Sequence, residues 1–326
     1  MTSQVREVGR QAQTNQRRVE TTGVSRQLAE RRLEAEERKL ERRSGKIPPV
    51  LKLSVTIITL NEAEHIGAAI DSVRWADEIV VVDSGSTDGT TDIARTRGAT
   101  VITREWPGYV DQKNFAAERA SHDWIFSLDA DERVTPALAA EIRTLLAAGP
   151  AAPAYRIARV TFHLGRWLRT TDFYPDSQTR LYDRRAARWR GKYVHESLSA
   201  DGPVGRLNEE IQHYSYRDLH DHMDRINHYT SLAARQMHEA GRRTWPLDLL
   251  VHPPAAFLRN FVLRRGFLDG GVGLTLSLVN AYAVFVKFAK LWELQRRPTP
   301  RASAPPTGHR DTEAQNPSNG TSSVSL

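Results

Sequence analysis

Short apolar runs alternate with polar, helix-like segments between residues 53 and 148. The apolar runs are rich in β-branched residues, whereas the segments between them place apolar residues at helical spacing, as Ile66, Ile70 and Val73 show. The pattern predicts strands over 53–59, 78–82, 100–103 and 124–128, with helices over 62–74, 92–97 and 111–120 between them. Continuous apolar strands separated by helices are typical of a parallel sheet that is covered on both faces.

The pattern changes after residue 148. A helix over 135–148 and a strand over 154–160 precede an aromatic and Arg-rich stretch, and three helices are predicted over 219–240, 247–265 and 273–295. Residues 270–286 carry no charge, which is the lower limit for a membrane-spanning helix. Basic residues on both sides favour a helical pair lying in an anionic membrane interface; a helix packed on the catalytic domain or on a second subunit is the alternative.

Composition and charge divide the chain into four parts. Residues 1–47 form a charged arm, 48–216 a catalytic domain with halves 53–148 and 149–216, 217–297 a helical region, and 298–326 a disordered tail. Of the net charge of +7, five units lie in residues 1–46, so the folded body is nearly neutral and no nucleic-acid partner is indicated. The chain has no cysteine, which excludes disulfides and thiolate metal sites. No secretory signal opens it, so we expect a cytoplasmic protein.

The chemistry is concentrated where strands end. The strand over 124–128 runs into Asp129-Ala130-Asp131-Glu132, and several carboxylates at a buried strand end are costly without a cation. Mg²⁺ is typically held by one or two carboxylates together with substrate phosphates, so this segment predicts a Mg²⁺ or Mn²⁺ site; a solvated acidic turn is the alternative.

The loops after the first two strands lead to the same edge of a parallel sheet, where ligands bind in such folds. They read Thr59-Leu60-Asn61-Glu62 and Asp83-Ser84-Gly85-Ser86-Thr87-Asp88-Gly89. Neither contains the dinucleotide fingerprint G-x-G-x-x-G, and the P-loop G-x-x-x-x-G-K-[ST] is also missing. A nucleotide is therefore expected to be bound by acidic residues and a metal ion.

These segments, with Gln112-Lys113-Asn114, resemble the ordered motif set of family 2 glycosyltransferases, which have the GT-A fold. The resemblance covers residues 53–146. Further segments resemble the subgroup that contains bacterial lipopolysaccharide core β-glucosyltransferases and extend the match to residue 294: 173–176, 178–182, 194–197 and 265–271. The implied fold class is α/β of GT-A type: a mostly parallel sheet with helices on both faces, a Rossmann-like nucleotide half, and a C-terminal helical region.

The resemblance also implies roles for single residues. Asp131, with Asp129, would hold the divalent metal, and Glu196 would be the general base, with His195 orienting the acceptor or approaching the metal. Asp172 and Asp176 compete with Glu196 for the role of base, and His213 is a further candidate on the metal side. The remaining candidates would bind the nucleotide or its phosphates: Thr59, Asn61, Glu62, Asp83, Ser84, Lys113, Asp129 and Arg180.

We therefore expect a metal-dependent inverting glycosyltransferase that moves a hexose, glucose first among them, from a UDP-sugar to a hydroxyl of a lipid-linked saccharide such as lipopolysaccharide core. Its expected location is peripheral, on the cytoplasmic face of the inner membrane. Copies of the same chain are a further candidate partner, in a homo-oligomer. Two alternatives remain open at this point: a nucleotidyltransferase that makes activated sugars, and a non-catalytic nucleotide-sugar-binding membrane adaptor.

Overall fold

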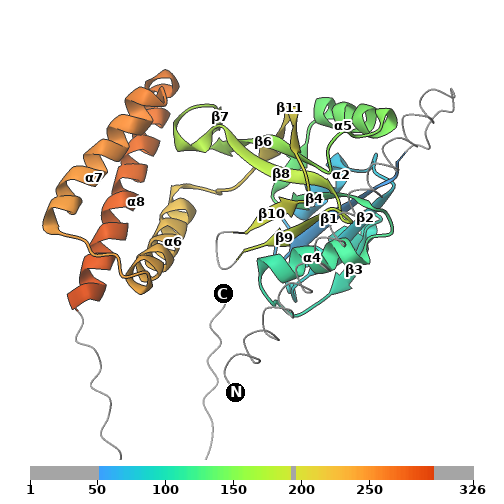
Figure 1. The fold of residues 1–326 in the computed structure, drawn as a ribbon, viewed down its shortest axis with the longest axis horizontal. Helices are drawn as coiled ribbons and strands as arrows, with labels where there is room; N and C mark the ends of the chain where they lie inside the picture. The colour runs from blue at the N-terminus through green and yellow to red at the C-terminus, as the bar shows by residue number, and fades with distance from the viewer. Residues whose placement is uncertain (1–50, 192–195, 297–326) are drawn as a thin grey trace, which may run out of the picture.

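The computed structural model describes residues 51–191 and 196–296. The predicted arm (1–47) and tail (298–326) lie outside these ranges, and so does His195. The predicted strand–helix alternation of the first half is confirmed (Figure 1), with the elements β1 (Leu53–Thr59), α2 (Ile66–Ser72), β2 (Glu78–Asp83), α3 (Thr90–Thr96), β3 (Thr100–Thr103), α4 (Tyr109–Arg119) and β4 (Trp124–Asp129).

The second half of the catalytic domain completes the sheet. Its elements are β5 (Glu132–Val134), α5 (Pro136–Ala148), β6 (Ala154–His163), β7 (Arg166–Leu168), a 3-10 turn (Thr171–Phe173), β8 (Asp176–Asp183), β9 (Ala187–Arg190), β10 (Ser197–Ala200) and β11 (Val204–His213). Within the described residues nine strands form one sheet in the order β3-β2-β1-β4-β8-β6-β11-β5, with β7 paired to β6. Strands β9 and β10 form a separate antiparallel pair.

The predicted fold class is confirmed. Strands β3, β2, β1 and β4 are all parallel, and β11 is parallel to β6. Strand β8 is antiparallel to both β4 and β6 and so joins the two halves. The sequence pattern did not specify these antiparallel pairings, because they depend on which distant strands become neighbours.

Successive residues of the central strands face different layers, which explains their continuous apolar sequence. Val81 and Phe126 belong to the cluster beneath α2, α3 and α5, whereas Val80, Val82 and Ile125 belong to the cluster beneath α4 and the β9–β10 pair. Because both faces of the sheet are covered by apolar packing, only the strand ends are open to a ligand.

The register of the parallel strands brings the ends of β1, β2 and β4 together. Thr59 on β1 is opposite Asp83 on β2, and Ile58 on β1 is opposite Asp129 on β4. The predicted convergence of these loops at one sheet edge therefore follows directly from parallel pairing.

The helical region packs beside the catalytic domain as α6 (Leu219–Glu239), α7 (Pro246–Leu258) and α8 (Gly270–Arg296), close to the predicted ranges. A π-helical turn (Arg259–Leu263) and a 3-10 turn (Gly266–Asp269) connect α7 to α8, and α8 packs against both α6 and α7 (Figure 1). In the part of the chain that the structure describes, only Gly266–Arg296 is long and apolar enough to cross a membrane by length and composition, and 22% of its most apolar window is buried.

The first turn of α8 approaches the backbone of Gly266 closely at Gly273. A Cβ atom added to Gly273 would lie 1.8 Å from the carbonyl oxygen of Gly266, whereas one added to Gly271 would meet no atom within 4 Å. Backbone atoms cannot yield as the end of a long side chain can, so position 273 requires glycine.

The substitution Gly273→Ala is accordingly expected to lower the free energy of unfolding by about 1–3 kcal/mol, the usual cost of overpacking. Chemical denaturation followed by circular dichroism would measure the change. Gly271→Ala, two residues away in the same helix, is the matched control and should leave stability equal or slightly higher, because alanine favours a helix over glycine. Equal stability of the two variants would contradict the close approach seen here.

Candidate active site

The loop after β2 is organised around the carboxylate of Asp83, which is 1% exposed. One of its oxygens accepts hydrogen bonds from the backbone N–H groups of Gly85 and Ser86, both at 2.9 Å, and the other accepts from the Ser86 hydroxyl. Gly85 has φ +98°, a conformation that favours glycine. Asp83 thus shapes the loop that follows it.

The loop after β1 is tied to this second loop. The backbone N–H of Asn61 donates to the Ser86 hydroxyl at 2.8 Å, and the Asn61 side-chain oxygen accepts from the Thr87 N–H at 2.9 Å. The N–H of Ser84 donates to the Thr59 carbonyl at 2.9 Å. The predicted nucleotide-binding residues Thr59, Asn61, Glu62, Asp83 and Ser84 therefore lie in one pair of interlocked loops.

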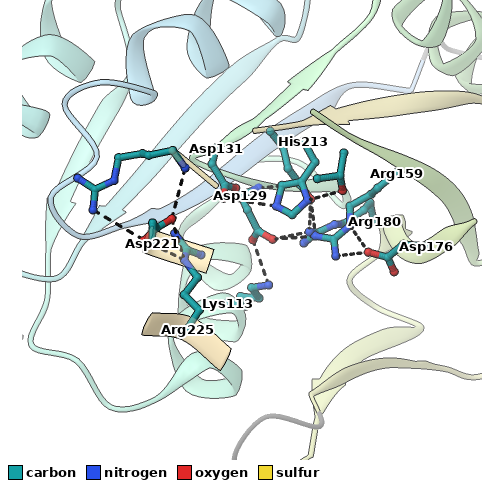
Figure 2. Close-up of polar contacts among 12 residues, drawn as sticks. Lys113, Asp129, Asp131, Arg159, Asp176, Arg180, His213, Asp221 and Arg225 are labelled. Atoms are coloured by element: carbon teal, nitrogen blue, oxygen red, sulfur yellow. Dashed lines mark hydrogen bonds and ion pairs between the residues drawn. The ribbon is translucent and has the colours of Figure 1, made fainter. Parts of the chain in front are cut away.

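Asp129, at the end of β4, is surrounded by cations (Figure 2). Its Oδ1 atom lies 3.2 Å from Nζ of Lys113, and its Oδ2 atom accepts a hydrogen bond from Arg180. Burial alone would raise the pKa of Asp129, but Arg180, Lys113 and Arg159 outweigh burial and hold it well below its ordinary value. Lys113 is 6% exposed, so it is a buried residue of α4 and not a surface lysine.

Two residues of this network were not among the predicted site residues. Glu132 is fully buried; its Oε1 atom accepts from Arg180 at 2.6 Å and from Arg159 at 2.9 Å, and its Oε2 atom accepts from the Asp129 N–H at 2.9 Å. Arg159 also donates to Asp176 through Nε at 2.9 Å. The available signals were a third acidic residue, directly after Asp131, and an arginine inside a largely apolar strand.

Arg180 acts on the site through these carboxylates. It is 2% exposed, and its terminal nitrogen is bound to both Asp129 and Glu132. The predicted contact of Arg180 with a phosphate remains a prediction, and the described geometry assigns it first to holding Asp129.

Asp131 lies outside this network of paired charges. Its Oδ2 atom is 3.4 Å from Nε2 of His213, while Nδ1 of His213 lies 3.5 Å from the Thr161 hydroxyl (Figure 2). Burial would raise the pKa of Asp131, but the hydrogen bond to His213 and its charge lower it. His213 thus contacts Asp131, the residue predicted to hold the metal; a metal-side role of His213 stays a prediction.

Glu62 shares this environment with Asp131. Burial raises its pKa to about 7, the negative charge of Asp131 adds to the rise, and Arg225 opposes it. Glu62 therefore lacks full compensation by protein cations, whereas the charge of Asp131 is stabilised by His213.

The oxygen and nitrogen donors that remain suit a hard divalent cation that also binds substrate. The described residues contain no group of three or more His, Cys, Asp or Glu side chains that could hold a metal by themselves. Asp131 and His213 nevertheless supply two ligands, and Mg²⁺ usually completes its shell with water and phosphate oxygens. The negative charge of Asp131, which adds to the raised pKa of Glu62, fits the presence of such a cation.

A cavity of about 390 Å³ adjoins this edge. Arg159, Asp176 and His213 line it from the sheet, and Arg225 and Tyr229 line it from α6. Since His213 contacts Asp131, the cavity leads directly to the acidic edge.

Glu196 is the predicted base with an available oxygen. Its Oε2 atom is buried and has no hydrogen-bond partner among the described residues. By contrast, Asp176 is bound by Arg159 and Gln178, and Asp172 is bound by Arg259, Arg264 and Asn280.

Tyr109 of α4 connects Glu196 with the acidic edge. Burial raises the pKa of Tyr109, and the charges of Glu196 and Asp129 both add to the rise, so the two carboxylates act on one phenol. His195, the other predicted catalytic residue, lies outside the described residues.

Comparison with known proteins agrees with this arrangement. The model of the family "Glycosyl transferase family 2" matches residues 54–199, and an uncharacterized glycosyltransferase of Rickettsia bellii is 34% identical over 76% of this chain and 89% of its own length. The chain belongs to glycosyltransferase family 2.

Other relatives of this glycosyltransferase are similar over most of their length. The lipopolysaccharide core biosynthesis glycosyltransferase LpsC of Rhizobium meliloti is 33% identical over 77% of this chain and 96% of its own length. Among solved structures, a mannosyltransferase of Pyrobaculum calidifontis in complex with GDP-Man and Mn²⁺ is 18% identical, with a TM-score of 0.45 over 74% of this chain and 87% of its own.

Replacing Glu62 by glutamine is expected to benefit stability more at pH 8 than at pH 5. Folded Glu62 keeps its proton to about pH 7, while the unfolded chain releases it near the ordinary value of 4.5. The stability that this bound proton contributes is complete below pH 4.5 and lost as the pH rises through 7. Glutamine removes the titration, so the melting temperature of the variant relative to wild type should be higher at pH 8.

The exposed Glu64, two residues along, provides the control: Glu64→Gln should shift the melting temperature equally at both pH values. If the difference in melting temperature between Glu62→Gln and wild type stays constant from pH 5 to pH 8, the result would count against the buried, repelled carboxylate described above.

Proposed function

We propose that this glycosyltransferase moves a hexose, glucose first among them, from a UDP-sugar to a hydroxyl of a membrane-associated glycan such as lipopolysaccharide core, with inversion at the transferred carbon. The observation that carries the proposal is the meeting of Asp129 and Asp131 at one sheet edge, next to a cavity. The Oε2 atom of Glu196, which is buried and has no hydrogen-bond partner among the described residues, supports a general base. The name of the relative LpsC supports a lipopolysaccharide acceptor.

On the donor side, the interlocked loops after β1 and β2 would receive the nucleoside. Asn61 and Glu62 line this part, and Asp83 holds the loop in shape while keeping acceptor capacity for a base or ribose N–H or O–H. Lys113 and Asp129 form its floor, with Arg180 fixing Asp129 from below.

Asp131 and His213 would hold a Mg²⁺ or Mn²⁺ ion together with the donor's diphosphate. When bound, such an ion supplies Lewis acidity and neutralises the charge that develops on the leaving nucleoside diphosphate. The protein keeps these two ligands oriented through the Thr161 contact to His213 and the Tyr214 N–H bond to the Asp131 carbonyl, 2.9 Å long.

On the acceptor side, Glu196 would take the proton of the attacking hydroxyl. Inversion requires the nucleophile and the leaving group to be roughly in line on opposite faces of the sugar, so the base must lie away from the diphosphate. Glu196 comes from the segment before β10, while the metal ligands come from the turn after β4 and the end of β11. His195 stays a predicted neighbour in acceptor orientation.

The cavity between the sheet and α6 would take the acceptor sugar. Its wall combines aromatic rings, Phe173, Tyr216 and Tyr229, with the charged groups Arg159 and Arg225. Aromatic faces beside polar groups suit a carbohydrate, which presents both C–H surfaces and hydroxyls.

Glu196→Gln is expected to reduce transfer by a factor of about 10²–10⁴, the usual contribution of a general base, while leaving UDP binding unchanged. Release of UDP from UDP-glucose would be measured with Mn²⁺ and with glycan isolated from cells that lack this protein. Asp176→Asn serves as the comparison for a competing carboxylate. Full transfer by Glu196→Gln would remove Glu196 as the base.

Asp131→Asn is expected to weaken metal-dependent binding of UDP at least tenfold, because it removes a charged ligand. Titration calorimetry with UDP, in the presence of Mn²⁺ and then of EDTA, gives the comparison. Asp111→Asn, an exposed carboxylate on α4, is the control and should bind as wild type does. Equal UDP affinity of the wild type with Mn²⁺ and with EDTA would argue against a metal-held diphosphate.

The same two experiments separate an enzyme from a non-catalytic nucleotide-sugar-binding protein. An adaptor would bind UDP with metal but release none from UDP-glucose, whatever residue stands at 196.

A further inference from the structure

The helix α7 carries an apolar row on the side that faces away from α8. Residues that face inward include Ala256, which is buried, and His252, whose ring stacks on Phe288 of α8 at 4.5 Å. The outward row follows helical spacing and is strongly exposed: Leu247 66%, Leu250 72%, Val251 53% and Leu258 55%. Exposed apolar residues at this spacing form one continuous face.

The turns between α7 and α8 extend this face. Leu263 is 76% exposed, Leu268 62%, and Val262 and Phe267 are each 49% exposed. Of the nineteen large apolar side chains that are exposed in the described residues, thirteen lie between Trp245 and Phe285. Contiguous apolar surface of this kind marks a site of interaction.

Helix α8 presents two different faces. Leu276, Val279, Asn280 and Ala283 line the cavity that adjoins the acidic edge, whereas Leu274, Leu278, Tyr282 and Phe285 are 41–55% exposed. At about 100° per residue these two rows lie on opposite sides of the helix. One helix therefore separates the cavity from the exposed apolar surface.

The charge of this region is one-sided. Between residues 247 and 292 the acidic residues are Asp248, which is 31% exposed and lies 3.3 Å from His252, and Asp269, which is buried and paired with Arg166 at 2.9 Å. The same stretch contains five basic residues: Arg259, Arg264, Arg265, Lys287 and Lys290. Arg265 is exposed beside Leu263 and Phe267 and has no ion pair among the described residues.

We infer that the outer side of the α7–α8 hairpin, formed by the rows 247–268 and 274–285, docks on the surface of a bilayer that contains anionic lipids. The apolar rows enter the boundary between headgroups and acyl chains, and Arg265 meets the lipid phosphates. This names the surface and the lipid chemistry that the proposed function leaves open. The docking itself does not depend on the proposed function; only its consequence for how the acceptor reaches the cavity rests on that function.

The charge distribution favours a bilayer over a second copy of the chain. In a symmetric dimer the same patch would face itself, and Arg265 would find no unpaired carboxylate there, because Asp248 and Asp269 are already paired with His252 and Arg166 within the chain. An anionic membrane surface supplies the missing negative charge and covers the apolar rows together.

Docking would also place the cavity at a defined distance from the lipid. Since α8 alone lies between the two, the cavity is about one helix diameter, roughly 10 Å, from the surface that α8 exposes. A saccharide attached to a membrane lipid could thus reach the cavity while its lipid part remains in the bilayer.

Flotation of the full chain with vesicles tests the docking without donor or acceptor. Wild type is expected to float with vesicles of phosphatidylcholine and phosphatidylglycerol and only weakly with phosphatidylcholine alone. Leu263→Glu should reduce the equilibrium constant for vesicle binding about tenfold or more, as expected when one leucine is lost from an apolar environment. Arg265→Gln should weaken binding to the anionic vesicles only.

Two substitutions on other exposed positions serve as controls. Val204→Glu on β11, 41% exposed, and Arg143→Gln on α5 should float as wild type does. All variants should keep metal-dependent UDP binding, which shows that they are folded. Vesicle binding that Leu263→Glu leaves unchanged would overturn the inference.

Two further results would also overturn it. Wild-type protein that resists extraction at alkaline pH would indicate a spanning helix, and a wild-type dimer that Leu263→Glu makes monomeric would indicate a second copy on this face. If the protein does not bind vesicles but still transfers the sugar, the docking inference fails and the proposed function stands. The two proposals can therefore fail separately.

Discussion

Three carboxylates and three cations are packed together at the strand ends, and the site depends on their balance. Asp129, Glu132 and Asp176 are held by Arg159, Arg180 and Lys113 through the contacts of Figure 2. A buried charge is costly unless it is paired and hydrogen-bonded, and removing one partner of a buried pair costs about 3–5 kcal/mol. Because this network is balanced, it adds no attraction for a diphosphate. Two carboxylates lie outside it: Asp131 is stabilised by His213, and Glu62 has a pKa raised to about 7 by burial and by the charge of Asp131. A divalent cation bound beside them would favour the charged forms of both.

The same ion network joins the two halves of the catalytic domain. Asp129 and Glu132 come from the nucleotide half, whereas Arg159 and Arg180 come from β6 and β8 of the acceptor half. Strand β8 lies between β4 and β6, so its arginine reaches across the junction. The proposed donor and acceptor sites would therefore have a fixed relation to each other, which in-line transfer between two bound sugars requires.

Parallel topology made much of this predictable from sequence. Once three apolar strands are taken as parallel, Thr59, Asp83 and Asp129 must end at the same edge, and the register confirms it. Glu132 and Arg159 could not be found in this way. Their roles depend on antiparallel pairing between distant strands, and an isolated arginine in an apolar strand gives no indication of the carboxylate that it meets. The contacts of Arg180 with Asp129 and Glu132, and of Asp83 with the loop that follows it, could not be foreseen from the sequence either.

Ion pairs and hydrogen bonds join the α7–α8 hairpin to the wall of the cavity proposed for the acceptor. Asp172, which lines the cavity, accepts a hydrogen bond from Arg259 at 2.6 Å and forms an ion pair with Arg264 at 3.2 Å, and both arginines belong to the segment between α7 and α8. A second link joins Arg166 to Asp269 at 2.9 Å, and the Thr171 N–H donates to the Arg264 carbonyl at 3.1 Å. Charged and backbone contacts at both ends of the loop leave it little freedom to move apart from the hairpin. Any surface that fixes the position of α7 and α8 would therefore also fix this wall of the cavity, and with it the position in which an acceptor sugar is held.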